Sequence, residues 1–222
     1  MNKKKIRRLM NKYGLKCPIR KANPYRRMAN ALRTNSVTAN HVNREFREHG
    51  ARSIILTDIT YIRLNDGFCY LSVMMDAYTK QVLSHQLNRS LEVDFVLRTV
   101  EQLIAEHGEE LPENVYIHSD QGCHYTSIAF RELLRNVNLR QSMSRRGNCW
   151  DNAPQESFFG TMKEETKPYI KECKAFDQLH DLIDDWIDYY NNDRLVETLN
   201  EMAPNEFYQY LLSSEEVNSA SL

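Results

Sequence analysis

The sequence predicts an α/β fold, and three observations lead to that prediction. Three β-rich stretches follow one another in residues 53–87, a helical pattern then alternates with short apolar strands, and the last third is mostly helical. Alternation of this kind places helices on the faces of a sheet. A chain of 222 residues with 41% hydrophobic and 27% charged residues has the composition of a globular domain, long enough for one sizeable core and a small appendage.

The first 50 residues predict a basic arm. Residues 2–13 have the pattern of a short helix between a capping Asn2 and a terminating Gly14, residues 15–40 read as an irregular linker, and a second short helix is expected over 38–48. Residues 1–52 hold 15 Lys and Arg against 2 Asp and Glu, which leaves 29−15=14 basic and 30−2=28 acidic residues in the remainder. This asymmetry suggests a polyanionic partner, most simply nucleic acid, with a solvated leader as the alternative.

The core elements follow in a regular order. Strands are expected over 53–59, 68–75 and 81–87, with a hairpin turn at Asn65-Asp66-Gly67 and a second turn at Ala77–Lys80. The remaining expected elements are a helix over 91–107, a strand over 115–119, a helix over 127–136, a strand over 139–142, a polar loop over 144–150, and helices over 151–167 and 175–190. The aromatic stripe of the last helix indicates a buried face, with an inter-subunit surface as the alternative.

Composition excludes several classes of protein. No window approaches the run of about 18 apolar residues that spans a bilayer, and the N-terminus has no apolar export signal. The five cysteines are odd in number and form no CxxC pair, which indicates reduced thiols and argues against both a disulfide framework and a cysteine-based zinc site. We therefore expect a cytoplasmic protein that is associated with the nucleoid and not with a membrane.

Three carboxylates have the pattern of a metal-dependent catalytic site. Asp58 lies late in the first strand, Asp120 directly follows the 115–119 strand, and Glu156 lies on the helix over 151–167. Carboxylates at such positions are costly unless they are paired or bind a metal, and an oxygen-only donor set suits Mg²⁺ or Mn²⁺. Two such ions, about 3.5–4 Å apart, serve both ends of an in-line phosphoryl displacement, with Asp58 as the candidate bridging ligand.

Each carboxylate also has a plain structural alternative. Taken singly, a strand-end aspartate is more often a turn former or a helix cap, and Glu156 would be a solvated helix residue. Asp76, at the end of the second strand, is interpreted in this way, as an acceptor for the turn at Ala77–Lys80. Only the joint pattern of the three acids favours catalysis.

Five stretches, taken together, resemble the transposases of the IS-three family of bacterial insertion sequences, whose core is related to retroviral integrases. They are Thr57–Ile62, His118–Gly122 with Tyr125–Ser127, Ser142–Ala153, Glu156–Glu165 and Tyr189–Arg194. The 35 residues between Asp120 and Glu156 match the spacing typical of that family. The resemblance covers roughly residues 40–210, with a weaker match at 2–16.

The resemblance implies a fold and an activity. The fold is ribonuclease-H-like, a mixed five-stranded sheet flanked by helices, here with a short basic helical arm at the N-terminus. The activity is DNA strand cleavage and strand transfer with a 3′-hydroxyl, by a catalytic and metal-binding triad of Asp58, Asp120 and Glu156 with two Mg²⁺ or Mn²⁺ ions. The partners would be the DNA of the element's ends and of the target, bound by a homo-oligomer.

The resemblance also suggests DNA contacts. Lys163 lies two helical turns after Glu156, and Asn152 lies one turn before it, on the same helix face. Arg145 and Arg146 lie in the preceding loop and suit phosphate groups. A solvated lysine is the alternative for Lys163, and Trp150 is as readily a core residue. His118 and His124 flank Asp120, and we interpret both as hydrogen-bonding residues and not as metal ligands.

The expected domains are a basic arm over 1–50 that carries a remnant of a helix-turn-helix region, a catalytic core with C-terminal helices over 51–212, and a disordered tail over 213–222. Val196 departs from the family, which often has His at that position. Two other functions remain open at this stage. One is a ribonuclease-H-like nuclease that only hydrolyses, and the other is a truncated, non-catalytic DNA-binding remnant.

Overall fold

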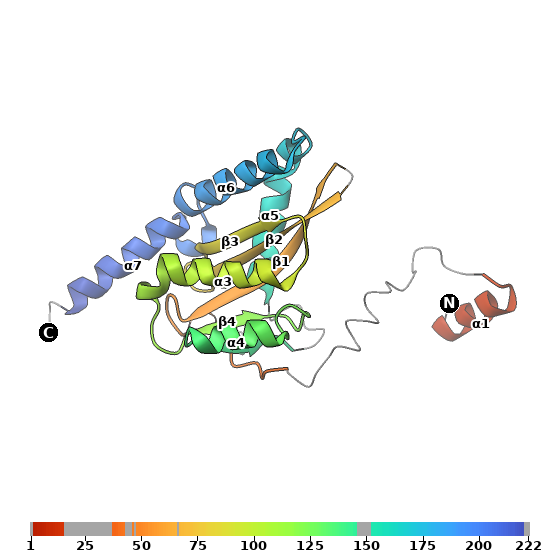
Figure 1. The fold of residues 1–222 in the computed structure, drawn as a ribbon, viewed down its shortest axis with the longest axis horizontal. Helices are drawn as coiled ribbons and strands as arrows, with labels where there is room; N and C mark the ends of the chain where they lie inside the picture. The colour runs from red at the N-terminus through yellow and green to blue at the C-terminus, as the bar shows by residue number, and fades with distance from the viewer. Residues whose placement is uncertain are drawn as a thin grey trace. The chain divides into compact units, whose positions relative to one another are not determined.

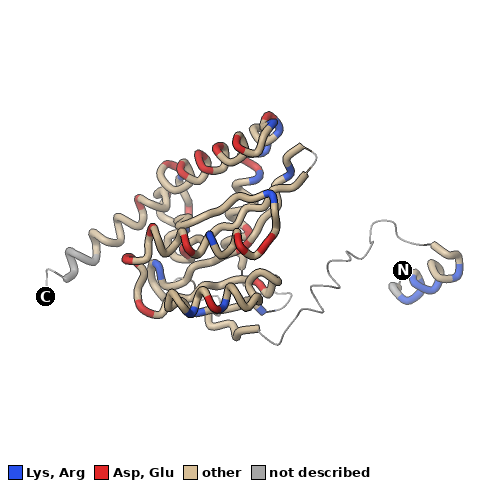
Figure 2. Tube along the Cα trace, viewed as in Figure 1, with Lys and Arg blue, Asp and Glu red and all other residues tan. Residues whose placement is uncertain are grey.

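The computed structural model describes residues 2–15, 37–42, 46, 48–65, 67–145 and 152–219. The chain divides into two units, residues 1–35 and 36–222, which are described separately. In the first unit, α1 (Lys3–Lys12) begins after Asn2, whose side-chain oxygen accepts a hydrogen bond of 3.0 Å from Lys4 N, as predicted for the cap. Lys and Arg make up much of the sequence of this helix (Figure 2).

The second unit is built on a mixed five-stranded sheet, which confirms the predicted fold (Figure 1). Its strands are β1 (Ile54–Leu64), β2 (Gly67–Asp76), β3 (Val82–Asn88), β4 (Tyr116–Ser119) and β5 (Arg140–Met143). The spatial order is β3-β2-β1-β4-β5. The first three strands pair antiparallel, whereas β4 pairs parallel to both β1 and β5.

The pairing of β1 changes along its length. The register with β2 runs from Ile55 opposite Asp76 to Leu64 opposite Gly67, so the hairpin closes at the predicted turn, of which Asp66 lies outside the described residues. By contrast, β4 pairs with β1 only along Ile54–Leu56. From Thr57 onward, β1 therefore has β2 on one side and an edge without a recorded strand partner on the other.

Helices cover both faces of the sheet. One face carries α3 (Val93–His107) and α4 (Ile128–Asn136), and their apolar residues form one core with Ile55 and Met74. The other face carries α5 (Ala153–Ile170) and α6 (Phe176–Asn192), packed on Leu56, Ile62 and Leu71. The aromatic stripe of α6 faces this second core, which confirms its interpretation as a buried face. The remaining elements are the 3₁₀ turns Gly108–Glu110 (η1) and Glu197–Leu199 (η3) and the helix α7 (Pro204–Ser219).

Two segments differ from the expected organisation. Residues 37–42 do not form a helix but lie against β5, where His41 N donates to Ser142 Oγ at 2.9 Å and Val42 enters the core. The rest of the helix expected over 38–48 falls partly on residues outside those described. At the other end, α7 begins with Pro204, a residue that suits the start of a helix. The helix continues to Ser219, into the segment for which a disordered tail was expected.

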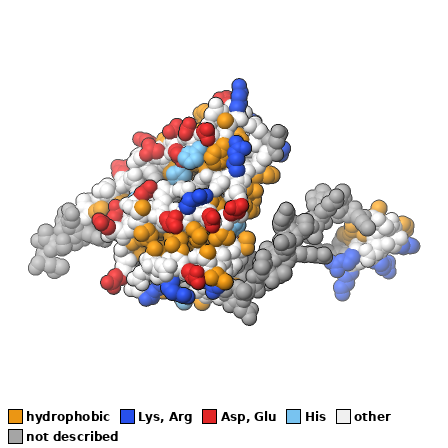
Figure 3. Space-filling model, viewed as in Figure 1, with side chains coloured by type: hydrophobic (Ala, Val, Ile, Leu, Met, Phe, Trp, Pro, Cys, Tyr) orange, Lys and Arg blue, Asp and Glu red, His pale blue; other side chains and the backbone are white. Residues whose placement is uncertain are grey.

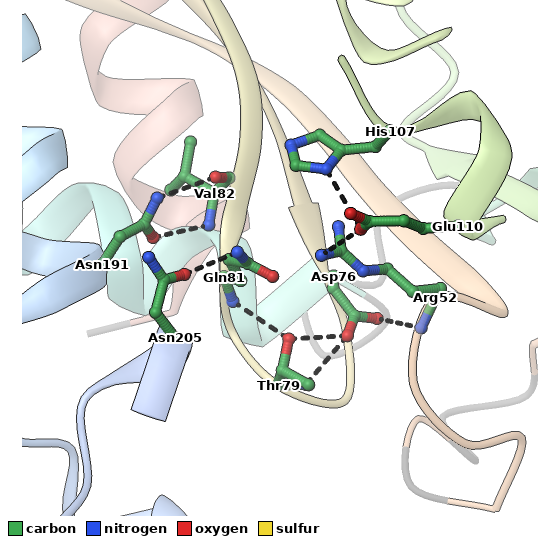
Figure 4. A network of polar contacts seen from close by, with 9 residues as sticks. All are labelled: Arg52, Asp76, Thr79, Gln81, Val82, His107, Glu110, Asn191 and Asn205. Carbon is green, nitrogen blue, oxygen red and sulfur yellow. Dashed lines mark hydrogen bonds and ion pairs between the residues drawn. The ribbon is translucent and has the colours of Figure 1, made fainter. Parts of the chain in front are cut away.

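Asp76 anchors the turn between β2 and β3, as its structural interpretation predicted (Figure 4). Its fully buried carboxylate accepts hydrogen bonds from the backbone N–H groups of Arg52, Tyr78 and Thr79, and from Thr79 Oγ1 at 2.7 Å. The Arg52 guanidinium pairs with Glu110 at 2.9 Å and lies over the ring of Tyr208 on α7. This network joins the start of β1, the β2–β3 turn, η1 and α7.

In the part of the chain that the structure describes, no helix combines the length and the apolar character needed to cross a lipid bilayer.

Candidate active site

Asp58 lies on β1, two residues past the last position that pairs with β4. On β2 its backbone partner is Val73. The carboxylate is partly buried, with Oδ1 accepting from Ile59 N at 2.8 Å and Oδ2 accepting from Asn152 Nδ2 at 3.3 Å. Asp58 therefore lies just beyond the point where β4 stops pairing with β1.

Asp120 directly follows β4. Its Oδ1 accepts a 2.7 Å hydrogen bond from Gly122 N. A Cβ atom at residue 122 would lie 2.8 Å from this oxygen, closer than such atoms approach, so the turn requires glycine there. The carboxylate is otherwise exposed and available to a ligand.

Tyr125 supports the loop that carries Asp120. Its ring is fully buried and packs edge-on against Phe130 of α4, and its hydroxyl lies 3.4 Å from Thr57 Oγ1 on β1. This contact ties the Asp120 loop to the residue that precedes Asp58. Burial, followed by the negative charge of Asp58, raises the pKa of Tyr125 well above its usual value, so its hydroxyl stays protonated.

Glu156 approaches from α5, where it is the acidic residue of the first turn and is exposed to solvent. Its charge acts on Asp58. Burial raises the pKa of Asp58 most, and the charges of Asp120 and then Glu156 raise it further, whereas the N–H of Ile59 and the charge of Lys163 lower it; the result is a pKa of about 7. Three carboxylates from three elements thus share one electrostatic environment.

The donor set fits a divalent cation, although it is not gathered at coordination distance. Oxygen-only carboxylates suit Mg²⁺ or Mn²⁺, and a cation would relieve the mutual repulsion that raises the pKa of Asp58. Among the described residues, however, no group of three or more His, Cys, Asp or Glu side chains is arranged to hold a metal ion. Glu156 is near enough for its charge to affect Asp58, but its side chain is exposed to solvent and would have to turn inward to share a metal ion with Asp58.

Two of the predicted DNA-contact residues lie beside Asp58. The side chain of Lys163 on α5 is largely exposed. Its pKa is nevertheless lowered, because the loss of some hydration outweighs the opposing effect of the negative charge of Asp58. Asn152 is buried at the start of α5 and donates to Asp58, while its Oδ1 has no hydrogen-bond partner among the described residues. The sequence did not indicate this contact between Asn152 and Asp58.

The other predicted contacts are placed only in part. Arg145 is exposed just after β5, and Arg146 and Trp150 lie outside the described residues. The hydrogen-bonding interpretation of the two histidines is confirmed. His118 Nδ1 lies 3.0 Å from Ser142 Oγ, and His124 Nε2 lies 3.0 Å from Leu91 O.

Sequence reasoning assigned no role to Tyr61 or Tyr125, although both lie near the acids. The pKa of Tyr61 is raised, mainly by burial and then by the neighbouring Tyr70 and Cys123. Asp58 and Asp120 make smaller contributions in the same direction. Tyr125 falls within a stretch that carries the family resemblance, and this was the only signal that could have pointed to it.

Two sequence models described as "Integrase core domain" match the chain, over residues 48–149 and 137–204. An uncharacterized transposase-like protein of Haemophilus influenzae is 33% identical over 206 residues, which cover 92% of this chain and 91% of that protein. The putative transposase InsK for insertion sequence element IS150 of Escherichia coli is 31% identical over 93% of this chain and 71% of its own length. The transposase for insertion sequence element IS904 of Lactococcus lactis is 30% identical over 94% of this chain and 81% of its own.

Solved structures with the same fold come from viral integrases and a transposase. The catalytic core domain of HTLV-2 integrase in complex with magnesium has a TM-score of 0.57 at 17% identity, over 71% of this chain and 96% of that one. A chain of the simian T-cell lymphotropic virus intasome has a TM-score of 0.58 at 18% identity, over 81% of this chain and 59% of the viral one. The Mos1 transposase catalytic domain has a TM-score of 0.50 at 16% identity, over 62% and 70%. At these identities the likeness concerns the ribonuclease-H-like fold.

Proposed function

The chain belongs to the integrase-core family of insertion-sequence transposases, enzymes of the polynucleotidyl transferase class, and we propose that it cuts and joins DNA through Asp58, Asp120 and Glu156. The observation that carries the proposal is the convergence of these three carboxylates. They come from β1, from the loop after β4 and from α5, and the charges of Asp120 and Glu156 both act on Asp58, close to the point where β4 stops pairing with β1. In sheets of this type, functional groups collect at the carboxyl ends of strands.

The residues fit a metal-assisted reaction on phosphodiesters. When bound, two Mg²⁺ or Mn²⁺ ions stabilise both the attacking and the leaving oxygen of an in-line displacement. Asp58, on which the charges of both other acids act, is the candidate shared ligand, and Asp120 and Glu156 would each complete one side. Asn152 holds one oxygen of Asp58 by its hydrogen bond, and Lys163 supplies positive charge beside the site for a phosphate.

The stretches that resemble the IS-three family support membership of that family, and the substrates would then be the element's own ends and a target duplex. The intasome named among the similar structures supports action as a homo-oligomer on DNA. The basic helix α1 suits contact with a phosphate backbone, and the nucleoid would be the place of action.

Metal-dependent nicking and joining of DNA by the purified chain tests the proposal. We compare the parent with Asp120→Asn and Glu156→Gln in Mg²⁺ or Mn²⁺. Activity that is lost in both variants supports the triad, and joined products favour a transposase over a nuclease that only hydrolyses. Activity that survives both substitutions overturns the triad. A parent chain that binds DNA but neither cuts nor joins it would favour a non-catalytic remnant.

A further inference from the structure

A groove runs beside the candidate active site, between the outer half of β1 and the C-terminal half of α5. It has a volume of about 490 Å³. Its lining residues are Tyr61, Ile62, Arg63 and Asn65 from β1 and the hairpin turn, and Lys163, Glu164, Lys167 and Ile170 from α5 with Lys171, the residue that caps the helix. The groove exists because β4 pairs with β1 only as far as Leu56, which leaves α5 as the neighbour of the open edge.

The groove is basic in an acidic core. Lys163, Lys167 and Lys171 follow one another at intervals of four residues and so lie on one face of α5, and Arg63 stands on the opposite wall. Four basic residues against one acid give the lining a formal charge of 4−1=+3. Residues 53–222 hold only 14 basic residues against 28 acidic ones, so four of the 14 line this one groove.

The single acid of the lining does not neutralise it. Glu164 Oε1 lies 3.8 Å from Lys167 Nζ, and both side chains are largely exposed, at 78% and 62%. An exposed pair of this kind contributes little, because water and salt screen the attraction. The contrast with the surroundings is visible in the views by charge, where acidic residues follow α6 and are spread over the core, while Lys and Arg stand in a few separate places (Figures 2 and 3).

The groove adjoins the candidate active site through Lys163. On α5 the same helix carries Glu156 and then Lys163, whose charge acts on Asp58. On β1, Asp58 is followed by Tyr61, which is 53% exposed and belongs to the lining. From Lys163 to Lys171 the helix rises about 12 Å. This length spans about three to four phosphates of one strand of a duplex, which are spaced about 3.4 Å apart along the axis.

We propose that this groove binds the phosphodiester backbone of the DNA strand that continues from the scissile phosphate, with Arg63, Lys167 and Lys171 as its phosphate contacts. The inference rests on the proposed function, because that function places a phosphodiester at the mouth of the groove. The occupant is a DNA strand and not an acidic peptide, since regularly spaced positive charges begin at a site built for phosphodiester chemistry. The exposed ring of Tyr61 offers a face for a sugar or a base.

The salt dependence of DNA binding tests this inference without catalysis. We measure the binding of a 30-base-pair random-sequence duplex by fluorescence anisotropy, in EDTA, at several salt concentrations. The variant is Lys167→Gln with Lys171→Gln. The matched control is Arg98→Gln with Arg135→Gln, which also removes two exposed positive charges, one of them from the last turn of a helix. A charge-preserving variant, Lys167→Arg with Lys171→Arg, separates charge from packing.

The expected result is a smaller slope of log Kd against log salt concentration in the glutamine variant. Each lost phosphate contact lowers the slope by about 0.9, so the pair lowers it by about 1.8, while the control and arginine variants keep the parent slope. Equal slopes in the parent and the glutamine variant overturn the inference, as does a parent that binds no duplex at low salt. Binding of a glutamate-rich peptide that is lost in the glutamine variant, while DNA binding and its salt slope stay at the parent level, would assign the groove to a protein partner instead.

The outcome is separable from that of the proposed function. Loss of the groove contacts would lower the salt slope whether or not the triad cleaves DNA. Conversely, cleavage that depends on Asp120 and Glu156, together with an unchanged slope, would retain the catalytic proposal and reject the groove.

Discussion

The carboxamide of Asn152 donates a hydrogen bond of 3.3 Å to the carboxylate of Asp58, across 94 positions of sequence. This contact fixes the start of α5 against β1, and it therefore sets the distance between the helix that carries Glu156 and the strand that carries Asp58. Asn152 thus has a positioning role that is independent of any contact with DNA.

Replacement of Asn152 by alanine should lower the rate of DNA cleavage by about 10–100-fold, the usual cost of losing a residue that orients a metal ligand. The loss should be smaller at high Mn²⁺ concentration, because the cation then helps to order Asp58. Cleavage rates over a Mn²⁺ titration measure this, with the exposed Asn136→Ala as the control. A uniform loss at all Mn²⁺ concentrations would argue against the positioning role.

The raised pKa of Asp58 predicts a pH-dependent stability in the absence of divalent ions. In the folded protein the pKa of Asp58 is about 7, whereas the ordinary pKa of an aspartate carboxyl is 3.8. This contribution to the free energy of unfolding is present below pH 4 and is lost as the pH rises through about 7. Asp58→Asn should therefore be more stable than the parent at pH 8 in EDTA, by roughly 1–2 kcal/mol after allowance for partial exposure.

Urea unfolding at pH 5 and pH 8 measures the effect of Asp58→Asn. Asp185→Asn, an exposed substitution on α6, serves as the control and should show the same difference between the two pH values as the parent. Equal stability of Asp58→Asn and the parent at pH 8 would contradict the raised pKa of Asp58, which burial and then the neighbouring carboxylates cause.

Gly122→Ala should disable catalysis while the fold remains. The added methyl group would lie 2.8 Å from Asp120 Oδ1 and displace that carboxylate from its turn. We expect cleavage to fall toward the level of Asp120→Asn, with a stability loss of about 1–2 kcal/mol. Gly108→Ala is the matched control, because its Cβ would meet only Ile104 Cγ2, at 3.5 Å. Full activity of Gly122→Ala would show that the Asp120 turn tolerates displacement.

Asp76 should matter for stability and not for chemistry. Asp76→Ala leaves the buried N–H groups of Tyr78 and Thr79 and the Thr79 hydroxyl without their acceptor, at a cost of about 3 kcal/mol or more. Thermal unfolding followed by circular dichroism measures the loss, and Thr79→Ser, which keeps the hydroxyl, should lie near the parent. A change in cleavage rate at a temperature where the variant is folded would show that the network also reaches the active site.

The order of strands and helices followed from the sequence because apolar periodicity reports burial directly. The length of β1, however, did not follow from the sequence. The predicted strand stopped at Ile59, whereas pairing with β2 continues to Leu64. Beyond Ile59 the buried residues Thr60, Ile62 and Leu64 alternate with the exposed Tyr61 and Arg63, and only the pairing in the hairpin shows that this alternation continues the strand.

The positions of Asp58, Asp120 and Glu156 on their elements were predictable, because each acid interrupts or adjoins an apolar pattern. The Asn152 contact and the support from Tyr125 were not, since both join segments that are far apart in the sequence. The groove was equally hidden. Its basic face is visible in the spacing of Lys163, Lys167 and Lys171, but its second wall depends on where β4 stops pairing with β1.

The short parallel pairing of β1 with β4 also has a consequence for folding order. Ile54 pairs with Tyr116, so this contact closes a long stretch of chain, and contacts of that kind form slowly. Asp58 and Asp120 come together only after this closure, and Glu156 joins them only when α5 has packed on the sheet. Under the proposed function, a nascent or partly folded chain would carry the three acids without an assembled site, and it could cut DNA only once the whole core is complete.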